Sequence, residues 1–382
     1  MPTPPTSVAL LNVPRQTAAI RPELDAAIAQ VLDHGMFING PEVAQLEAEL
    51  ASYCGTKFAI ACASGSDAIL LPLMALGVGP GHRVLTVPFT FFATGGCIAR
   101  LGADPVFVDI DPVTFNMDPA AVARYLDGLS PEELLRVKAI LPVHLFGQCA
   151  AMDPLNEVAA RYGIPVIEDA AQAIGAAYKG HRAGSLGWCG AFSFFPSKNL
   201  GGLGDGGLIT TNDADLAAKL RILREHGSEA RYFHRMVGMN SRLDTLQAAT
   251  LLAKFRHLDA WTASRRAHAA IYLDQLQLGQ VQGLLLPRQS PECLHVYNQF
   301  TIRVQNRDEL RDHLAAAGVA SAIYYPVPLH LQECFAGLGY KPGDMPHSEA
   351  AARTVLSIPV ESSLTDDEVR YAADRINEAL SY

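Results

Sequence analysis

The sequence is poor in cysteine, with seven in 382 residues, and no two of them form a Cys-x-x-Cys pair. Such pairs are typical of zinc sites, and an even set of cysteines is typical of small disulfide-stabilised domains. Here the cysteines are scattered and odd in number. We therefore expect free thiols, a cytoplasmic protein and no metal site.

The chain also lacks an excess of positive charge. It has 30 Lys and Arg against 39 Asp and Glu, a net charge of −9, so no broad positive field attracts nucleic acid or an anionic membrane. This balance does not exclude a local phosphate site. We expect no nucleic-acid partner.

Long hydrophobic runs are absent as well. The longest apolar stretch, residues 68–76, is interrupted by Pro72 and is far shorter than the ~20 residues that cross a bilayer. The first 20 residues contain one basic residue, Arg15, and do not read as a signal peptide. We expect no membrane partner.

What the chain has is 49% hydrophobic and 18% charged residues, a composition typical of a globular protein with a large core. Between about residues 40 and 225, short apolar runs alternate with amphipathic helical patterns such as residues 42–53, 119–126 and 154–162. The predicted strands are residues 57–63, 83–89, 105–110, 138–144, 165–169, 190–195 and 207–211. This alternation indicates an α/β fold with a largely parallel sheet covered on both faces.

The pattern changes after His226. Two long helical patterns, residues 244–255 and 261–278, are followed by a predicted strand at 297–304 and a helix at 307–317. We therefore predict a large domain over residues 1–245, with an N-terminal arm, and a small α+β domain over residues 246–382. Ligands of α/β sheets bind beyond the carboxyl ends of the strands, so the chemistry should lie in the turns that follow them.

One such turn is the segment of small residues 63–67. Ser64, Gly65 and Ser66 follow a predicted strand and open a predicted helix, where backbone N–H groups can bind an anion such as phosphate. The alternative is a helix cap, because Ser64 and Asp67 are spaced as a capping box. Taken alone, the segment favours the cap.

Two charged residues, Asp169 and Lys198, come at or just after the ends of apolar strands. A buried carboxylate needs a cationic partner, and one candidate is the protonated ring nitrogen of pyridoxal phosphate (PLP). The alternative is that Asp169 caps the next helix. Lys198 is surrounded in sequence by aromatic residues and glycines. Desolvation there would lower its pKa and make the amine nucleophilic, as Schiff-base chemistry requires.

Residues 202–207 match the G-x-G-x-x-G spelling of a dinucleotide-binding loop. That fingerprint should open a helix, whereas this run precedes a predicted strand. We therefore expect a glycine-rich turn with positive φ angles, which argues against an NAD-dependent oxidoreductase.

Three further segments carry weaker signals. Residues 88–94 include three aromatic residues, most of which we expect in the core, although one could stack on a planar cofactor. Asn240 and Arg242 precede a predicted helix and could cap it or bind an anion. We interpret Arg265 and Arg266 as the solvated face of a helix.

In this order, Glu-Asp-Ala-Ala-Gln at 168–172, Ser-Phe-Phe-Pro-Ser-Lys at 193–198 and Gly-x-Asn-Ser-Arg at 238–242 resemble the DegT-type family of PLP-dependent sugar aminotransferases, which have the aspartate aminotransferase-like fold type I. The resemblance covers nearly the whole chain. It implies a large PLP-binding domain with a mixed, mainly parallel seven-stranded sheet between helices. It further implies amino transfer from L-glutamate to a UDP- or dTDP-linked 3-keto or 4-keto hexose, for amino-sugar biosynthesis.

The resemblance also assigns the catalytic residues. Lys198 would bind PLP as a Schiff base and act as the general base. Asp169 would pair with the pyridinium nitrogen, Gln172 would bond near the ring hydroxyl, and Phe91 would stack on the ring.

Four further residues would hold the cofactor phosphate. Gly65, Ser66 and Ser193 would do so from the same subunit. Asn240 would reach the phosphate of the neighbouring subunit, which implies a homodimer with shared active sites.

Three residues would lie near the sugar: Arg242, Tyr325 and His330. Tyr324 stands where some relatives that act on acidic sugars have His, which counts against a uronic acid without excluding it.

The resemblance leaves two alternatives open. One is a PLP-dependent sugar dehydratase, although relatives of that type replace the lysine with His. The other is a noncatalytic PLP-binding regulator.

Overall fold

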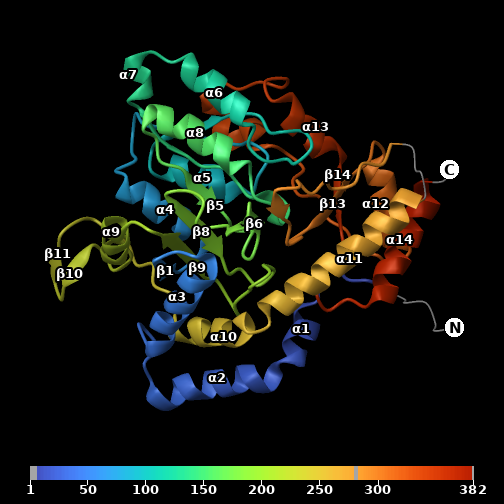
Figure 1. Ribbon diagram of the computed structural model, residues 1–382, viewed down its shortest axis with the longest axis horizontal. Coiled ribbons are helices and arrows are strands. Elements are labelled where there is room, and N and C mark those ends of the chain that lie inside the picture. Colours follow the sequence, from blue (N-terminus) through green and yellow to red (C-terminus); the bar gives the residue numbers. More distant parts are fainter. Residues whose placement is uncertain (1–6, 279–282, 381–382) are drawn as a thin grey trace.

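The computed structural model describes residues 7–278 and 283–380. Within them, seven strands form the main sheet: β1 (Phe58–Cys62), β2 (Arg83–Thr86), β3 (Asp104–Phe107), β4 (Val137–Ile140), β5 (Ile167–Asp169), β8 (Cys189–Ser193) and β9 (Gly207–Thr211). Each overlaps one of the predicted strands. The helices that accompany the sheet are α3 (Pro41–Cys54), α4 (Gly65–Ala75), α5 (Phe92–Arg100), α6 (Pro119–Asp127), α7 (Pro131–Leu134), α8 (Met152–Tyr162), α9 (Ala214–Arg224) and α10 (Thr245–Phe255) (Figure 1).

The strand order is β3-β2-β4-β5-β8-β9-β1. Isolated parallel bridges from Ile140 to Val166 and from Val143 to Asp169 join β4 to β5. Among these strands, β9 alone runs in the direction opposite to the others. The predicted mixed, mainly parallel sheet is therefore confirmed.

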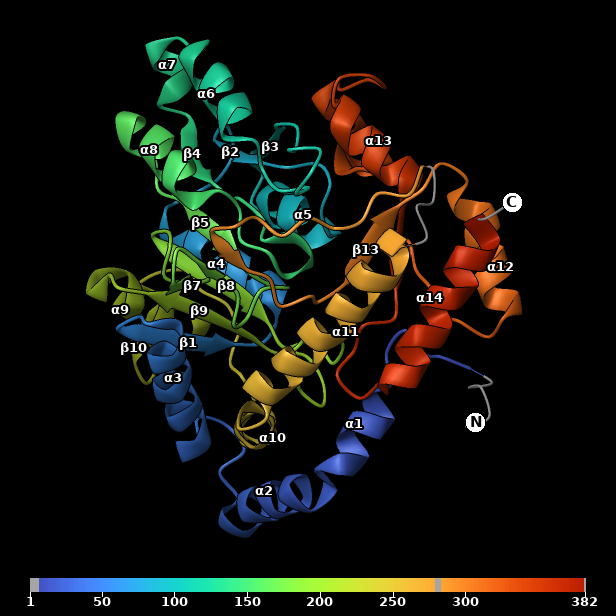
Figure 2. The same ribbon diagram turned by 45° about the vertical axis from the view of Figure 1, so that its right-hand side comes forward.

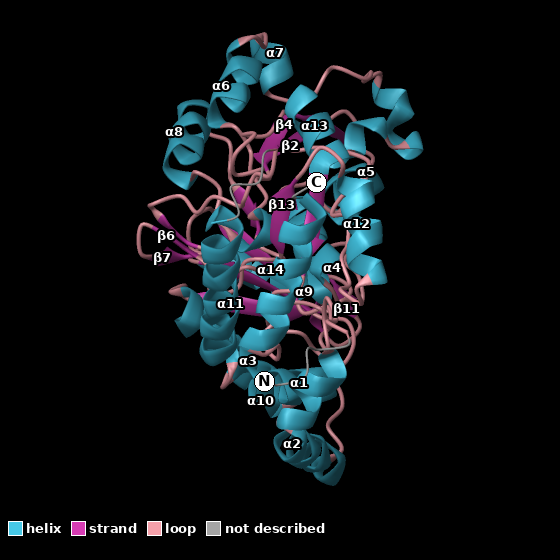
Figure 3. Cartoon of the chain, turned by 90° about the vertical axis from the view of Figure 1, so that its right-hand side faces the viewer, coloured by secondary structure: helices cyan, strands magenta, loops and turns pink. Residues whose placement is uncertain are grey.

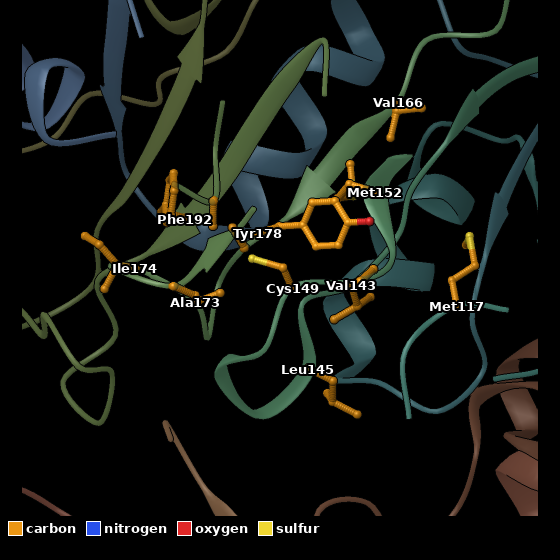
Figure 4. Close-up of a cluster of buried hydrophobic side chains, with 14 of the residues drawn as sticks. Met117, Val143, Leu145, Cys149, Met152, Val166, Ala173, Ile174, Tyr178 and Phe192 are labelled. Carbon is orange, nitrogen blue, oxygen red and sulfur yellow. The ribbon is translucent and has the colours of Figure 1, made fainter. Parts of the chain in front are cut away.

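Both faces of this sheet are buried. Successive residues of β1 point to opposite faces: Ala59 and Ala61 join a core with α3, α8 and α10, whereas Ile60 and Cys62 join a core with α4, α5 and α9. This is why the strands are apolar throughout instead of alternating with polar residues. Figure 4 shows part of the first core, in which Val143 lies near the turn that follows β4.

The C-terminal part is built on helices α11 (Leu258–Leu278), α12 (Arg307–Ala316) and α14 (Asp366–Leu380) and on the antiparallel strands β13 (Phe300–Arg303) and β14 (Val355–Ile358). Figure 3 shows these three helices on the side that faces the viewer. The remaining elements are α1 (Val13–Ala19), α2 (Arg21–His34), β6 (Ala177–Tyr178), β7 (His181–Arg182), β10 (Ser228–Ala230), β11 (Phe233–His234), β12 (Cys293–Leu294), α13 (Pro346–Thr354) and the 3-10 turns Leu145–Gly147, Leu329–Leu331 and Glu333–Leu338.

Contacts cross the predicted domain boundary in both directions. Val8 packs in the C-terminal core and exchanges backbone hydrogen bonds with Gly318 and Ala320. Helix α10 packs on α2 and α3, and Figure 2 shows it end-on beside these two helices. The division between residues 245 and 246 stays a prediction.

The described cysteines are all free, six of them buried and Cys334 exposed. Within residues 7–278 and 283–380, no helix combines the length and apolarity that crossing a membrane requires.

Candidate functional site

The turns after the strands meet around a cavity of about 490 Å³. The structure brings eight of the predicted site residues together in its lining: Gly65, Ser66, Phe91, Asp169, Gln172, Ser193, Lys198 and Tyr325. They come from segments that span more than half of the sequence. The cavity is therefore the candidate active site.

Asp169 ends strand β5 and is 4% exposed. Its Oδ2 accepts a hydrogen bond from Thr94 Oγ1 at 2.8 Å, and its Oδ1 accepts one from the Ala171 N–H at 3.2 Å. Burial raises the pKa of the carboxyl, and the Thr94 hydrogen bond opposes that rise. Such a group is suited to a cationic partner.

Lys198 follows β8, and its backbone N–H donates to the Phe195 carbonyl at 2.8 Å. Its side chain lines the cavity. Burial lowers the pKa of the amine to about 8, against the opposing effect of the Asp169 charge. At neutral pH, a larger fraction of this amine is therefore neutral and nucleophilic than of an ordinary lysine.

The first turn of α4 lines the part of the cavity that could hold an anion. Ser64 caps the helix by accepting from the Asp67 N–H at 3.1 Å. Gly65 lies so close to β8 that a Cβ atom would stand 2.5 Å from Ser193 Cβ. The missing side chain leaves the backbone N–H groups of the helix N-terminus accessible beside the Ser193 hydroxyl.

These residues fit PLP. The cavity offers an amine for a Schiff base, a buried carboxylate for a protonated ring nitrogen, and a helix N-terminus with hydroxyls for a phosphate. Each group is of the chemical type that one part of the cofactor needs.

Gln172 and the aromatic residues form another wall. Gln172 Oε1 accepts from the Phe146 N–H at 2.7 Å, and its Nε2 donates to Tyr325 Oη at 3.1 Å. Phe91 is 57% exposed and its ring lies 6.2 Å from that of Tyr325, whereas Phe89 is fully buried. Of the aromatics at 88–94, Phe91 is thus available for stacking. Phe92 is 48% exposed, so the expectation that most of them lie in the core was wrong.

The model of the DegT/DnrJ/EryC1/StrS aminotransferase family matches residues 18–377. The chain belongs to this family.

Individual relatives agree with this assignment over almost their whole length. The UDP-2-acetamido-2-deoxy-3-oxo-D-glucuronate aminotransferase of Pseudomonas aeruginosa is 46% identical over 95% of this chain and 98% of its own. A pleiotropic regulatory protein of Geobacillus stearothermophilus is 48% identical over 97% and 98%. The solved structure of S. venezuelae DesV in complex with a ketimine intermediate is 42% identical, covers 100% of both chains and has a TM-score of 0.94. The predicted family, fold class and enzyme class, a PLP-dependent sugar aminotransferase, are confirmed.

Three residues that the family resemblance singled out do not line this cavity. Asn240 is exposed, and Arg242 bonds to Glu225 at 3.2 Å. His330 is 1% exposed, with its Nε2 3.2 Å from Glu349 Oε1. Their roles toward cofactor or sugar stay predictions.

The segment that carries Asn240 is nevertheless hydrogen-bonded to α4, whose first turn lines the cavity. Ser241 Oγ donates to Asp67 Oδ2 at 2.7 Å, in the first turn of α4. The Asp67 carboxylate thus bonds to Ser241 while Ser64 caps the helix. The predicted helix cap is therefore present, and the anion site in the same turn stays a prediction.

The cavity also contains residues that the sequence did not single out. Thr90, Asp205 and Gln299 line it, and Thr94 bonds to Asp169. Tyr324, which the sequence singled out for its place before Tyr325, lines the cavity as well. The spacing of Thr90 and Thr94, one helical turn apart beside Phe91, is the one local signal that could have found the two threonines.

Two interpretations of local pattern were wrong. Glycines 201, 202, 204, 206 and 207 do not have positive φ; they allow close contacts instead, because a Cβ at Gly207 would lie 2.2 Å from the Ser64 carbonyl oxygen. Gly207 begins β9 and no helix follows directly, so no dinucleotide loop forms. Arg265 is 3% exposed and donates to the Tyr297 and Asn298 carbonyls, so it is not on a solvated face.

Proposed function

We propose that this aminotransferase moves an amino group from L-glutamate to a 3-keto hexose linked to a nucleotide diphosphate, in the cytoplasm, for amino-sugar biosynthesis. The observation that carries the proposal is the placement of Lys198 and Asp169 in one cavity with the N-terminus of α4. The 3-oxo sugar in the name of the Pseudomonas aeruginosa relative supports the position of amination.

The residues of the cavity have different roles in the reaction. When bound, PLP accepts the electron pair of the bond that breaks in the amino donor. The Lys198 amine holds the cofactor and then carries the proton that leaves and returns. The Asp169 carboxylate keeps the ring nitrogen protonated. Gly65, Ser66 and Ser193 hold the phosphate, Gln172 bonds beside the ring hydroxyl, and Phe91 covers the ring face.

We further infer a homodimer in which Asn240 of one subunit reaches the phosphate in the other. Asn240 is exposed and does not line the cavity of its own chain. Its neighbour Ser241 holds the segment against α4. Arg242, Tyr325 and His330 are proposed to act near the sugar.

Replacing the amine tests the function. Lys198→Ala should still bind PLP, but only noncovalently, and should not complete transamination, because no other amine lines the cavity among the described residues. Borohydride reduction followed by mass spectrometry measures the covalent bond. Lys57→Ala, at an exposed lysine, is the matched control. Full turnover by Lys198→Ala would overturn the proposal.

One observation favours a second candidate, a noncatalytic regulator, because the Geobacillus stearothermophilus relative is named as a regulatory protein. Glutamate separates the two. A transaminase loses the yellow absorbance of bound PLP when glutamate is added, and a keto sugar restores it; a regulator shows neither change. Screening UDP- and dTDP-linked 3-keto and 4-keto hexoses, with and without a carboxylate, then identifies the acceptor.

A further inference from the structure

Two threonine hydroxyls form a chain that ends on the catalytic carboxylate. Thr90 Oγ1 lies 2.9 Å from Thr94 Oγ1, which lies 2.8 Å from Asp169 Oδ2. The three residues are 3%, 1% and 4% exposed. The bonds are therefore shielded from competing water, where hydrogen bonds to a charged group are strongest.

The direction of this chain follows from its chemistry. An ionised carboxylate only accepts, so the single hydroxyl proton of Thr94 goes to Asp169. Thr94 Oγ1 can then only accept from Thr90, whose proton points inward along the chain. Both hydroxyl dipoles thus point their positive ends toward Asp169 and favour its charged form.

The hydrogen bonds of the other titratable groups around Asp169 go to other partners, although positive charge at His144 or Lys198 also favours the ionised form of Asp169. His144 Nε2 bonds to Glu168 at 2.9 Å, and Cys97 Sγ donates to the Ser66 carbonyl. Tyr325 Oη accepts from Gln172.

The positive charge of Lys198 favours the ionised form of Asp169. This effect disappears when the amine is neutral. Burial meanwhile favours protonation of Asp169. Among the described residues, the Asp169 carboxylate accepts hydrogen bonds from the Ala171 N–H at 3.2 Å and from the Thr94 hydroxyl.

We propose that Thr94, supported by Thr90, is a positioning residue for the aminotransferase: its hydroxyl keeps Asp169 ionised and fixed in one orientation, so that the carboxylate can hold the ring nitrogen of the cofactor protonated. This inference rests on the proposed pairing of Asp169 with that nitrogen. Thr94 itself is not a catalytic residue, because it acts through Asp169.

The test is the affinity of the protein for pyridoxamine phosphate as a function of pH, measured by calorimetry without glutamate or sugar. Thr94→Val removes the hydroxyl and keeps the shape of the side chain. It should bind about tenfold more weakly at pH 7, the usual effect of losing a hydrogen bond to a charged group. The loss of affinity on acidification should begin at higher pH than in the wild type, because Asp169 then protonates more readily.

Two variants separate this role from a structural one. Thr94→Ser keeps the hydroxyl and should restore the wild-type profile. Thr86→Val removes another buried hydroxyl, which bonds to the Leu141 carbonyl at 2.9 Å and not to Asp169. It should leave the profile unshifted. An unshifted Thr94→Val profile, or an equal shift in Thr86→Val, would overturn the inference.

Two further variants complete the design. If Thr94→Val does not fold, Thr90→Val decides, because loss of the outer hydroxyl should shift the profile in the same direction by less; an unshifted profile refutes the chain. Asp169→Asn tests the underlying pairing. If it binds as the wild type does, the proposed function of Asp169 fails. If it binds weakly while the threonine variants do not, only the role of Thr94 fails.

Discussion

Lys198 and Asp169 influence each other across the cavity. Burial lowers the pKa of the amine and raises that of the carboxyl, and the charge of each group opposes the change in the other. The sequence predicted a desolvated lysine and a buried aspartate that needs a partner. It did not predict the hydrogen bond from Thr94 to Asp169, because the two residues are 75 positions apart and the local spacing of Thr90 and Thr94 does not indicate their partner.

At the residue scale, the reactivity of cofactor-free protein should follow the neutral amine. Below about pH 8, the pKa of Lys198, capture of salicylaldehyde at Lys198 should slow about tenfold per pH unit, since only the unprotonated amine attacks. Reduction with borohydride and mass spectrometry of the Lys198 peptide measure the rate. Because salicylaldehyde has no ring nitrogen, the proposed pairing of Asp169 with the cofactor nitrogen does not contribute to this reaction.

Asp169→Asn provides the comparison for this profile. The Asp169 charge raises the pKa of Lys198, so its removal should move the profile to lower pH. A rate that is independent of pH between 6 and 8, or a shift in the opposite direction, would contradict this account of the pair.

At the scale of elements, the site depends on how closely α4 approaches β8. Sequence patterns predicted the strand, the turn and the helix, and the helix continues through Pro72. The reason for glycine at the first helical position is tertiary. The turn meets Ser193, which lies more than 120 residues further along the chain. The same applies to Gly207, whose neighbour is the Ser64 carbonyl.

Gly65→Ala should therefore weaken binding of pyridoxamine phosphate about tenfold or more. Its Cβ would lie 2.5 Å from Ser193 Cβ, which forces α4 away from β8, and overpacking of this kind costs about 1–3 kcal/mol. Gly79→Ala is the matched control, since its Cβ would meet no atom closer than 3.9 Å. Calorimetry and thermal melting distinguish loss of affinity from loss of stability; equal affinities of the two variants would contradict the packing argument.

At the scale of the whole molecule, the proposed active site is larger than one chain. Asn240 is exposed on a segment that Ser241 anchors to α4. A symmetric dimer would place two such segments at equivalent positions. In this arrangement, Asn240 of one chain would lie near the cofactor of the other chain, although it does not line the cavity of its own chain.

Mixed dimers test this sharing. Lys198→Ala and Asn240→Ala should each be inactive alone. In a dimer of one chain of each kind, one site combines an intact Lys198 with the partner's intact Asn240 and the other lacks both. Differently tagged mixed dimers should recover about half of the wild-type rate, because one of two symmetric sites is restored. No recovery in purified mixed dimers would show that Asn240 does not act across subunits.

The sequence by itself determined the strands of the sheet and the family, because these depend on residues that are neighbours along the chain. It also predicted Lys198 and Asp169 as the amine and the carboxylate of the site. Tertiary structure alone decided which groups surround them. It bonds Gln172 to Tyr325, 153 residues away, buries Arg265 and directs Thr94 to Asp169. Burial and hydrogen-bond partners arise where distant segments pack together, and a local pattern does not encode that packing.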